Sequence, residues 1–415
     1  MQTELAILNK QLTKTNPLLR YIILLGIIST IFMSVFEVLA LIQGTLASQT
    51  SALTPWYIKG IKDLCFLMIV VYAVTPLLLG GKIFRQTAIC AGFWLAGIIP
   101  SLLFSATVLP FPVLASGLRW ALPMLLPALL FYKLDISYMV RITNALILLF
   151  LFHLLVQIYQ LFFMGHWFGL NQWGFPSRLP GIFSIPNAAA FFNLSTLLFI
   201  DRFKSKKTFL FLAGLVSTFL TASGTGIITL LIFILFIIAR RIDVVRKNMK
   251  LYMLLCVPFF MSLGLTYINF FLPSRGSGYV AISLGTRFSI FIDAFSSGII
   301  STHMGLATNT GILFSNFLQL DSKTMIADNL YASILVNLGY WGLLFFGILI
   351  FIYFKPCFRK KTKKESNFYS FFLFLIAAFS FTTITFEVFP TNLLISIMIA
   401  FAHAPKHIHY QQGAS

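Results

Sequence analysis

Long apolar stretches alternate with short polar connections along almost the whole sequence. A helix that crosses a lipid bilayer needs about 20 consecutive apolar residues, and most of the stretches approach this length. The pattern therefore predicts about twelve transmembrane helices, the shorter of which must tilt or thin the bilayer locally. The predicted spans cover residues 20–42, 64–79, 87–105, 113–132, 142–164, 187–200, 208–222, 226–239, 251–272, 329–354, 367–386 and 391–404.

One polar connection is far longer than the others, the loop 273–327 between the ninth and tenth spans. No internal repeat, low-complexity linker or soluble domain interrupts the pattern. We therefore predict a single all-α, polytopic membrane domain over residues 1–415 with one long periplasmic loop. We expect the chemistry of the protein where this loop meets the membrane, because almost all other segments are typical of lipid-facing helices.

Composition supports a membrane protein and excludes an ordinary soluble domain. The chain is 59% hydrophobic and only 10% charged, whereas soluble domains contain roughly 25% charged residues. The net charge of +19 is explained by topology rather than by nucleic-acid binding, because basic residues concentrate in cytoplasmic loops. With both termini in the cytoplasm, about 23 of the 30 Lys and Arg residues fall on the cytoplasmic side. The exceptions are Lys59, Lys62, Arg119, Arg178, Arg275, Arg287 and Lys323.

The arginines on the outer side are the main candidates for ligand binding. Arg119 lies within an apolar span, Arg178 and Arg287 lie beside glycines, and Arg275 lies in the long loop. A guanidinium group is planar, stays charged in a dry site and binds phosphate in a bidentate way. Several such groups near the outer membrane face could hold a lipid diphosphate. The alternative is structural, in which each arginine pairs with a carboxylate or extends to the lipid headgroups.

Three further polar residues have two interpretations each. Asp328 begins the tenth span, where it could act as a general base with a raised pKa or only as the helix cap. Glu37, within the first span, could bind substrate or pair with Arg119. His303 lies in the segment Ser301–Gly305, which we expect to be flexible. No metal-binding or nucleotide-binding motif is present, so the sequence predicts neither a metal site nor a cofactor.

Three stretches together resemble the bacterial O-antigen polymerase and ligase family. The segment 178–187 is similar to the family's Arg-x-x-Gly segment followed by Pro-Asn at the start of a span. The segment 221–226 is similar to its hairpin, although many members have Ser-Arg where this chain has Ser-Gly. The third stretch comprises Gly285-Thr286-Arg287 and, further on, Asp328-Asn329 followed by Gly339 and Gly342. Ligases have His where this chain has Asp328, so the resemblance favours a polymerase.

The resemblance implies a GT-C-like glycosyltransferase at the outer face of the bacterial inner membrane. Its substrate would be an undecaprenyl-diphosphate-linked oligosaccharide, and its partners membrane lipid, a chain-length regulator and a flippase, with no nucleic acid. Arg178, Arg287 and Asp328 would then be catalytic. The substrate-binding residues would be Arg119, Arg275, Asn187, Asn329, His303 and Glu37. Three alternatives stay open, namely an O-antigen ligase, a lipid-linked oligosaccharide flippase or other transporter, and a peptidoglycan polymerase.

Overall fold

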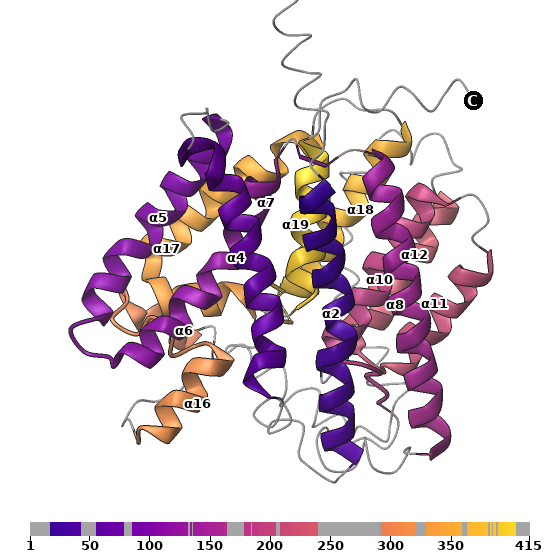
Figure 1. Cartoon of the computed structure of the whole chain (residues 1–415), viewed down its shortest axis with the longest axis horizontal. Helices are drawn as coiled ribbons and strands as arrows, with labels where there is room; N and C mark the ends of the chain where they lie inside the picture. Colours follow the sequence, from indigo (N-terminus) through magenta and orange to yellow (C-terminus); the bar gives the residue numbers. More distant parts are fainter. Residues whose placement is uncertain are drawn as a thin grey trace, which may run out of the picture.

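The computed structural model describes the greater part of the chain, and every regular element within that part is a helix (Figure 1). The described residues are 17–42, 55–78, 85–131, 133–134, 136–163, 178–183, 185–204, 208–239, 290, 292–319, 329–358, 363–380, 382–383, 385–386 and 389–403. The helices are α2 (Pro17–Ile42), α4 (Trp56–Leu78), α5 (Arg85–Ser105), α6 (Phe111–Ala121), η1 (Leu122–Leu125), α7 (Leu126–Leu130), α8 (Ile136–Phe163), α10 (Pro186–Phe203), α11 (Thr208–Leu220), α12 (Gly224–Ala239), η3 (Phe295–Ser297), α16 (Asn309–Phe317), α17 (Leu330–Phe354), η4 (Lys355–Phe358), α18 (Lys363–Ser380) and α19 (Thr391–Ala402).

Each predicted span except 251–272, which lies outside the described residues, overlaps one or more of these helices, whereas η3 and α16 lie in the predicted loop. Four described helical stretches are long and apolar enough to cross a membrane, and the protein is therefore an all-α, membrane-embedded protein. They are Arg85–Ser105, Phe111–Leu130, Ser137–Phe163 and Leu330–Phe354.

Two predicted spans differ from a simple helix, and each difference has a local cause. The fourth span is divided into α6, η1 and α7, so that Pro123 and Pro127 each fall in the first turn of a new segment. Proline is tolerated there because the first backbone N–H groups of a helix have no helical acceptor. The tenth span, α17, is interrupted at Gly339, whose φ of 70° is non-helical. A Cβ atom at this position would lie 2.7 Å from the Ile299 carbonyl oxygen, so only glycine fits without strain.

The core is richest in phenylalanine around α10. All of the residues from Ala188 to Ile200 are buried, which is typical of a helix surrounded by others. The helix α10 contacts α8, α11, α12, α18 and α19, and Figure 1 shows these helices grouped on one side of the molecule. On the other side, α17 packs along α5 and α16 packs against α6.

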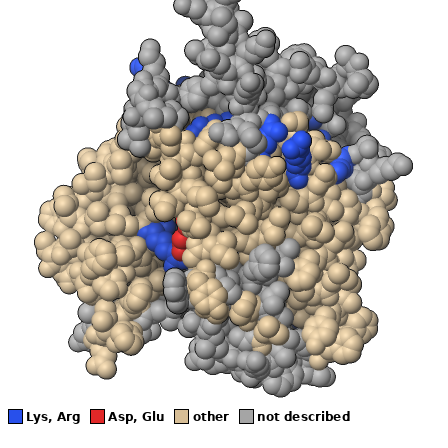
Figure 2. All heavy atoms as spheres, in the orientation of Figure 1, with Lys and Arg blue, Asp and Glu red and all other residues tan. Residues whose placement is uncertain are grey.

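Basic residues gather at one end of this helical bundle. Tyr138 Oη donates to the Arg20 carbonyl oxygen at 2.9 Å, which joins the starts of α2 and α8. Lys133 Nζ lies 4.9 Å from the centroid of the Tyr72 ring near the end of α4. The ring of Phe203 lies 5.7 Å from that of Phe401, so the ends of α10 and α19 also meet. We call this the basic end, and it comprises Arg20, Lys133, Arg202, Lys204 and Lys355. Figure 2 shows Lys and Arg side chains along the corresponding upper margin.

Candidate functional site

Two of the three segments singled out in the sequence meet at the end of the bundle opposite the basic end. The Leu179 N–H donates to the carbonyl oxygen of Leu220, the last residue of α11, at 2.9 Å. Asn187 Oδ1, in the first turn of α10, accepts from the Ser223 hydroxyl at 2.6 Å. Asn187 Nδ2 also donates to the Thr382 carbonyl oxygen at 3.1 Å, which adds the segment between α18 and α19. Asn187 therefore joins three parts of the chain that are distant in sequence.

Side-chain amides of α8 fix the backbone of the Arg178 segment. Gln160 exchanges two hydrogen bonds with Gly181, since its Oε1 accepts from the Gly181 N–H and its Nε2 donates to the Gly181 carbonyl, each at 2.9 Å. Gln157 Nε2 donates to the Leu179 carbonyl oxygen at 2.8 Å. The Arg178 segment is not helical, so its backbone N–H and C=O groups have no partners within a helix. In a bundle core with little water, these side-chain hydrogen bonds satisfy them instead. Arg178 is half-buried and directly precedes this fixed backbone.

His153 of α8 completes the support of this segment. Its Nδ1 accepts from the Ile182 N–H at 3.2 Å, so the histidine acts as an acceptor at this atom. Gly181 has a φ of +61°, and a Cβ atom there would lie 2.3 Å from the imidazole ring. The glycine is required because the turn needs a left-handed backbone and because the ring occupies the adjacent space.

Arg119 is paired, and its partner is Asp63. Arg119 Nε donates to Asp63 Oδ1 at 3.1 Å, and Nη2 lies 2.8 Å from Oδ2. Arg119 lies about two turns after the start of α6, and Asp63 about two turns after the start of α4, and the two side chains meet at this level along the two helices. The expectation that Arg119 pairs with Glu37 is therefore replaced by an ion pair with Asp63, and the side chain of Glu37 lies outside the described residues.

The segment around His303 is held in place, contrary to the expectation of a flexible loop. The Met304 N–H donates to Ser105 Oγ at 2.9 Å, and the Gly305 N–H donates to Asn337 Oδ1 at 2.8 Å. The Thr308 and Ser116 hydroxyls lie 2.5 Å apart. Polar residues of α5, α6 and α17 thus supply partners that the sequence of the loop alone does not reveal. The His303 side chain itself is exposed, with its Nδ1 3.2 Å from Thr302 Oγ1.

The interruption of α17 at Gly339 is part of the same contact. The Trp341 N–H donates to the Ile299 carbonyl oxygen at 2.9 Å. Ser101 Oγ of α5 donates to the Leu338 carbonyl oxygen, also at 2.9 Å, where the helix ends. Backbone groups released by a break within a membrane helix are tolerated when the protein satisfies them in this way. The part of the long loop at 298–308, which the structure describes, is therefore anchored to the membrane domain.

Asn329 is the N-cap of α17, since its Oδ1 accepts from the Ala332 N–H at 2.7 Å. Asn329, rather than Asp328, is therefore the helix cap. Its side-chain oxygen accepts a hydrogen bond from the N–H of the third residue of the helix, as is typical of an N-cap. Asp328, Arg275 and Arg287 lie outside the described residues, so their predicted functions stay predictions.

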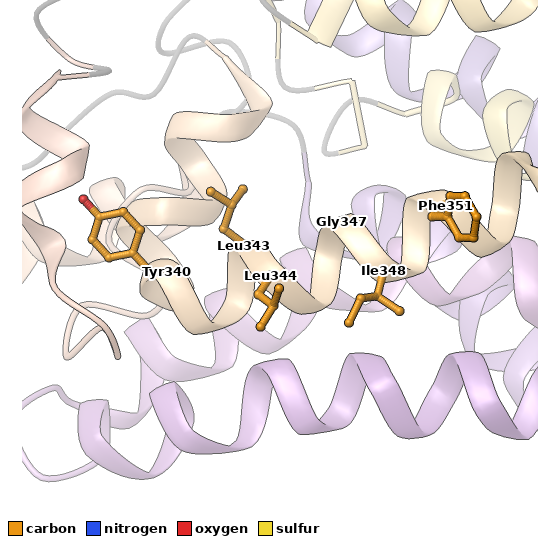
Figure 3. A pocket seen from close by; sticks show the side chains of 6 residues that line it. All are labelled: Tyr340, Leu343, Leu344, Gly347, Ile348 and Phe351. Carbon is orange, nitrogen blue, oxygen red and sulfur yellow. The ribbon is translucent and has the colours of Figure 1, made fainter.

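An apolar depression of about 560 Å³ follows α17 beyond the break (Figure 3). No residue predicted to bind substrate is among those that line it. They are Tyr340, Leu343, Leu344, Gly347, Ile348 and Phe351. Its lining offers a single hydroxyl group, which already donates to the Phe295 carbonyl oxygen at 2.8 Å. The described lining is therefore apolar, and it does not provide a site for polar chemistry.

Sequence reasoning did not identify Gln157, Gln160, Ser223 and Thr382 as parts of the site. A signal was present for the two glutamines, because they are spaced three residues apart in an apolar span and therefore share one helix face. Polar residues within a span usually have a defined partner. Ser223 lies in the segment 221–226 that the sequence singles out, but its contact with Asn187, like that of Thr382, depends on tertiary packing.

No protein-family model, curated protein or solved structure matches this chain.

Proposed function

We propose that this chain is a polysaccharide polymerase of the bacterial inner membrane, with about twelve spans, a GT-C-like fold and cytoplasmic termini. It would transfer an undecaprenyl-diphosphate-linked glycan to a sugar hydroxyl of a second lipid-linked repeat. The main support is the contact at Asn187, where two sequence segments chosen for their resemblance to O-antigen polymerases hydrogen-bond to each other. The concentration of basic residues at the other end supports an orientation with the site outside.

The proposed reaction exchanges one bond at the anomeric carbon. The acceptor hydroxyl oxygen forms a bond to this carbon, and the bond from the carbon to the diphosphate oxygen breaks with its electron pair leaving on the diphosphate. Arg178 and Arg287 would stabilise the charge on the leaving group, since fixed cations in a poorly hydrated site lower such a barrier by several kcal/mol. Asp328 would accept the proton of the hydroxyl. Arg119, Arg275, Asn187, Asn329, His303 and Glu37 are the remaining candidates for contact with substrate or for its support.

Within this proposal, Asn187 and Asn329 act through the backbone. Asn187 fixes the hairpin beside the Arg178 segment, and Asn329 fixes the first turn of α17, next to Asp328. Both are positioning residues, because their described hydrogen bonds are with the protein itself. His303 is exposed on an anchored segment and is available to a large polar substrate.

The test is the electrophoretic profile of surface polysaccharide in cells with and without the gene. Loss of the gene is expected to reduce long chains to single repeats, and the wild-type gene to restore them. The Arg178→Ala variant is expected to give single repeats while inserting normally into the membrane. The Arg141→Ala variant is the matched control, because Arg141 is exposed near the start of α8 and close to the basic end. Long chains made by Arg178→Ala would contradict the proposed function of this arginine.

Two outcomes of the same experiment would favour another function. Long polymer that accumulates on its lipid carrier without reaching lipid A core would indicate a ligase. Absence of any lipid-linked repeat at the outer face would indicate a flippase.

A further inference from the structure

The ion pair between Arg119 and Asp63 lies on a flank of the molecule that is otherwise apolar. The side chains of Arg119 and Asp63 are 38% and 40% exposed. Their neighbours Leu64 and Leu118 are 51% and 39% exposed. Figure 2 shows an isolated group of basic and acidic side chains within the tan surface of this face. Charges that face lipid hydrocarbon cost several kcal/mol, so a polar lipid group beside the exposed pair would lower its free energy.

The apolar part of α4 that follows Asp63 is short. From Leu64 to its end at Leu78, α4 provides only about 22 Å of apolar helix, less than the hydrocarbon thickness of about 30 Å. A short apolar helix thins the bilayer around it, which brings the phosphate level down towards Asp63. Arg119 lies about 12 Å from the start of α6, at the same height as Asp63, which it contacts.

The geometry of the pair leaves one edge of the guanidinium group open. Nε and Nη2 face the two carboxylate oxygens of Asp63, at 3.1 and 2.8 Å, which fixes the plane of the group. Among the residues that the structure describes, no polar atom contacts Nη1 of Arg119. The edge formed by Nη1 and the second N–H of Nη2 is a planar fork, which fits two oxygens of a phosphate group.

The local charge permits an anion at this edge. Arg119 and Asp63 together are neutral, so the pair itself carries no net negative charge that would repel an anion. Asp63 opposes an anion electrostatically, so its negative charge is not part of the binding group. The phosphate group of a lipid, whether a monoester, a diester or a diphosphate, offers two oxygens that match the fork, and the lipid chains would cover the surrounding leucines.

We propose that the flank formed by α4 and α6 binds the phosphate group of a membrane lipid through the open edge of Arg119. The lipid is either an anionic phospholipid or a polyprenyl phosphate or diphosphate. The two share the chemistry that the fork recognises. For a polyprenyl lipid the inference rests on the proposed function, because this lipid carries the proposed substrate. An anionic phospholipid would bind there whether or not the protein transfers sugars.

The experiment measures binding of phosphate compounds to the purified full-length chain in detergent. The probes are undecaprenyl phosphate, phosphatidylglycerol and inorganic diphosphate. The wild type is expected to bind at least one of the two lipids, and Arg119→Gln to bind it about tenfold more weakly or worse, because a charge-assisted contact is lost. The Arg141→Gln variant is the control and is expected to bind like the wild type. Selective binding of undecaprenyl phosphate would identify a carrier lipid, and equal binding of both lipids a general headgroup site.

The Asp63→Asn variant separates a binding site from a purely structural ion pair. Removing the negative charge should leave lipid binding unchanged or make it tighter, whereas Arg119→Gln weakens it. Equal weakening in both variants would show that the pair only joins two helices, and would overturn the proposal. Wild-type affinity in Arg119→Gln, or binding of inorganic diphosphate without either lipid, would overturn it too. Should Arg119→Gln fold poorly, Arg119→Lys keeps the charge, loses the fork and is expected to weaken binding severalfold.

Discussion

At the scale of single residues, Gly181 is the position where backbone conformation and packing set the strictest requirement. Its φ is +61°, and a Cβ atom would lie 2.3 Å from the His153 ring. We expect Gly181→Ala to destabilise the protein by about 1–3 kcal/mol and to reduce chain extension. The measurement is the thermal unfolding midpoint in detergent, together with the polysaccharide profile. The control is Gly92→Ala, since open space surrounds Gly92 in α5, and alanine there should be neutral or slightly stabilising.

Lys133 gives a prediction about pH at the same scale. Burial lowers its pKa from 10.5 to about 8, so the charged form is less stable in the folded protein than in the unfolded chain. The free-energy cost of burying the charged lysine is fully present below pH 8. It disappears as the pH rises through 10.5, the pKa of lysine in the unfolded chain. Lys133→Met keeps the apolar part of the side chain and should raise the unfolding midpoint at pH 7 by roughly 2–4 °C. This advantage should shrink above pH 8, and an advantage independent of pH would contradict the assigned cause.

The partner of Arg119 and the N-cap of α17 could not be decided from the sequence. Arg119 is recognisable as an arginine within an apolar span, but its partner depends on the relative height of two helices that are not neighbours in sequence. The choice between Glu37 and Asp63 could not be made from spacing. The N-cap of α17 differs by a single residue from the prediction, because Asp and Asn are about equally good caps. Such choices between adjacent polar residues are decided by backbone geometry.

At the scale of elements, the hairpin of α11 and α12 is tied to the start of α10 by a single short link. The Ser223 hydroxyl donates to Asn187 Oδ1 at 2.6 Å and accepts from the Gly226 N–H at 3.1 Å. We expect Ser223→Ala and Asn187→Ala each to cost about 1–3 kcal/mol, because each leaves half-buried or buried polar groups without a partner. Both variants should also lose long-chain polysaccharide if the hairpin positions the Arg178 segment.

The double variant tests whether this link is the cause. Since both single variants remove the same hydrogen bond, the double variant should cost less than the sum of the two, with a coupling of about 0.5–3 kcal/mol. Thermal or denaturant unfolding of the four proteins in one detergent provides the cycle. Additive effects would mean that the two side chains act independently, despite their contact.

The helices themselves were predictable because their apolar length alone defines them, while their interruptions were not. The fourth span was predicted as one helix, although Pro123 and Pro127 within it disfavour a continuous helix interior. Gly339 gave no such signal, since a glycine in a long apolar run is compatible with a continuous membrane helix. Its left-handed backbone becomes necessary only because Ile299, far away in sequence, approaches within contact distance. The anchoring of the loop through Asn337 and Ser105 has the same origin.

At the scale of the whole molecule, the chain is polarised along the axis of the bundle. One end gathers lysine and arginine, and the other holds the Arg178 segment, the hairpin and the anchored part of the long loop. The positive-inside rule then predicts which end faces the cytoplasm. Composition and spacing were enough to anticipate that basic residues gather at one end. In the predicted topology the chain crosses the membrane an even number of times between one basic loop and the next, so these loops lie on the same side, and no particular side-chain contact is needed.

Cysteine labelling tests this orientation directly. In a chain whose native cysteines Cys65, Cys90, Cys256 and Cys357 are replaced by alanine, His303→Cys places a thiol at an exposed position of the anchored loop. Lys204→Cys places one at the basic end. A maleimide that cannot cross membranes should label the first thiol in spheroplasts, and the second only after the membrane is opened. The reverse pattern would turn the Arg178 segment towards the cytoplasm, where lipid-linked repeats are assembled rather than polymerised, and would exclude the proposed reaction.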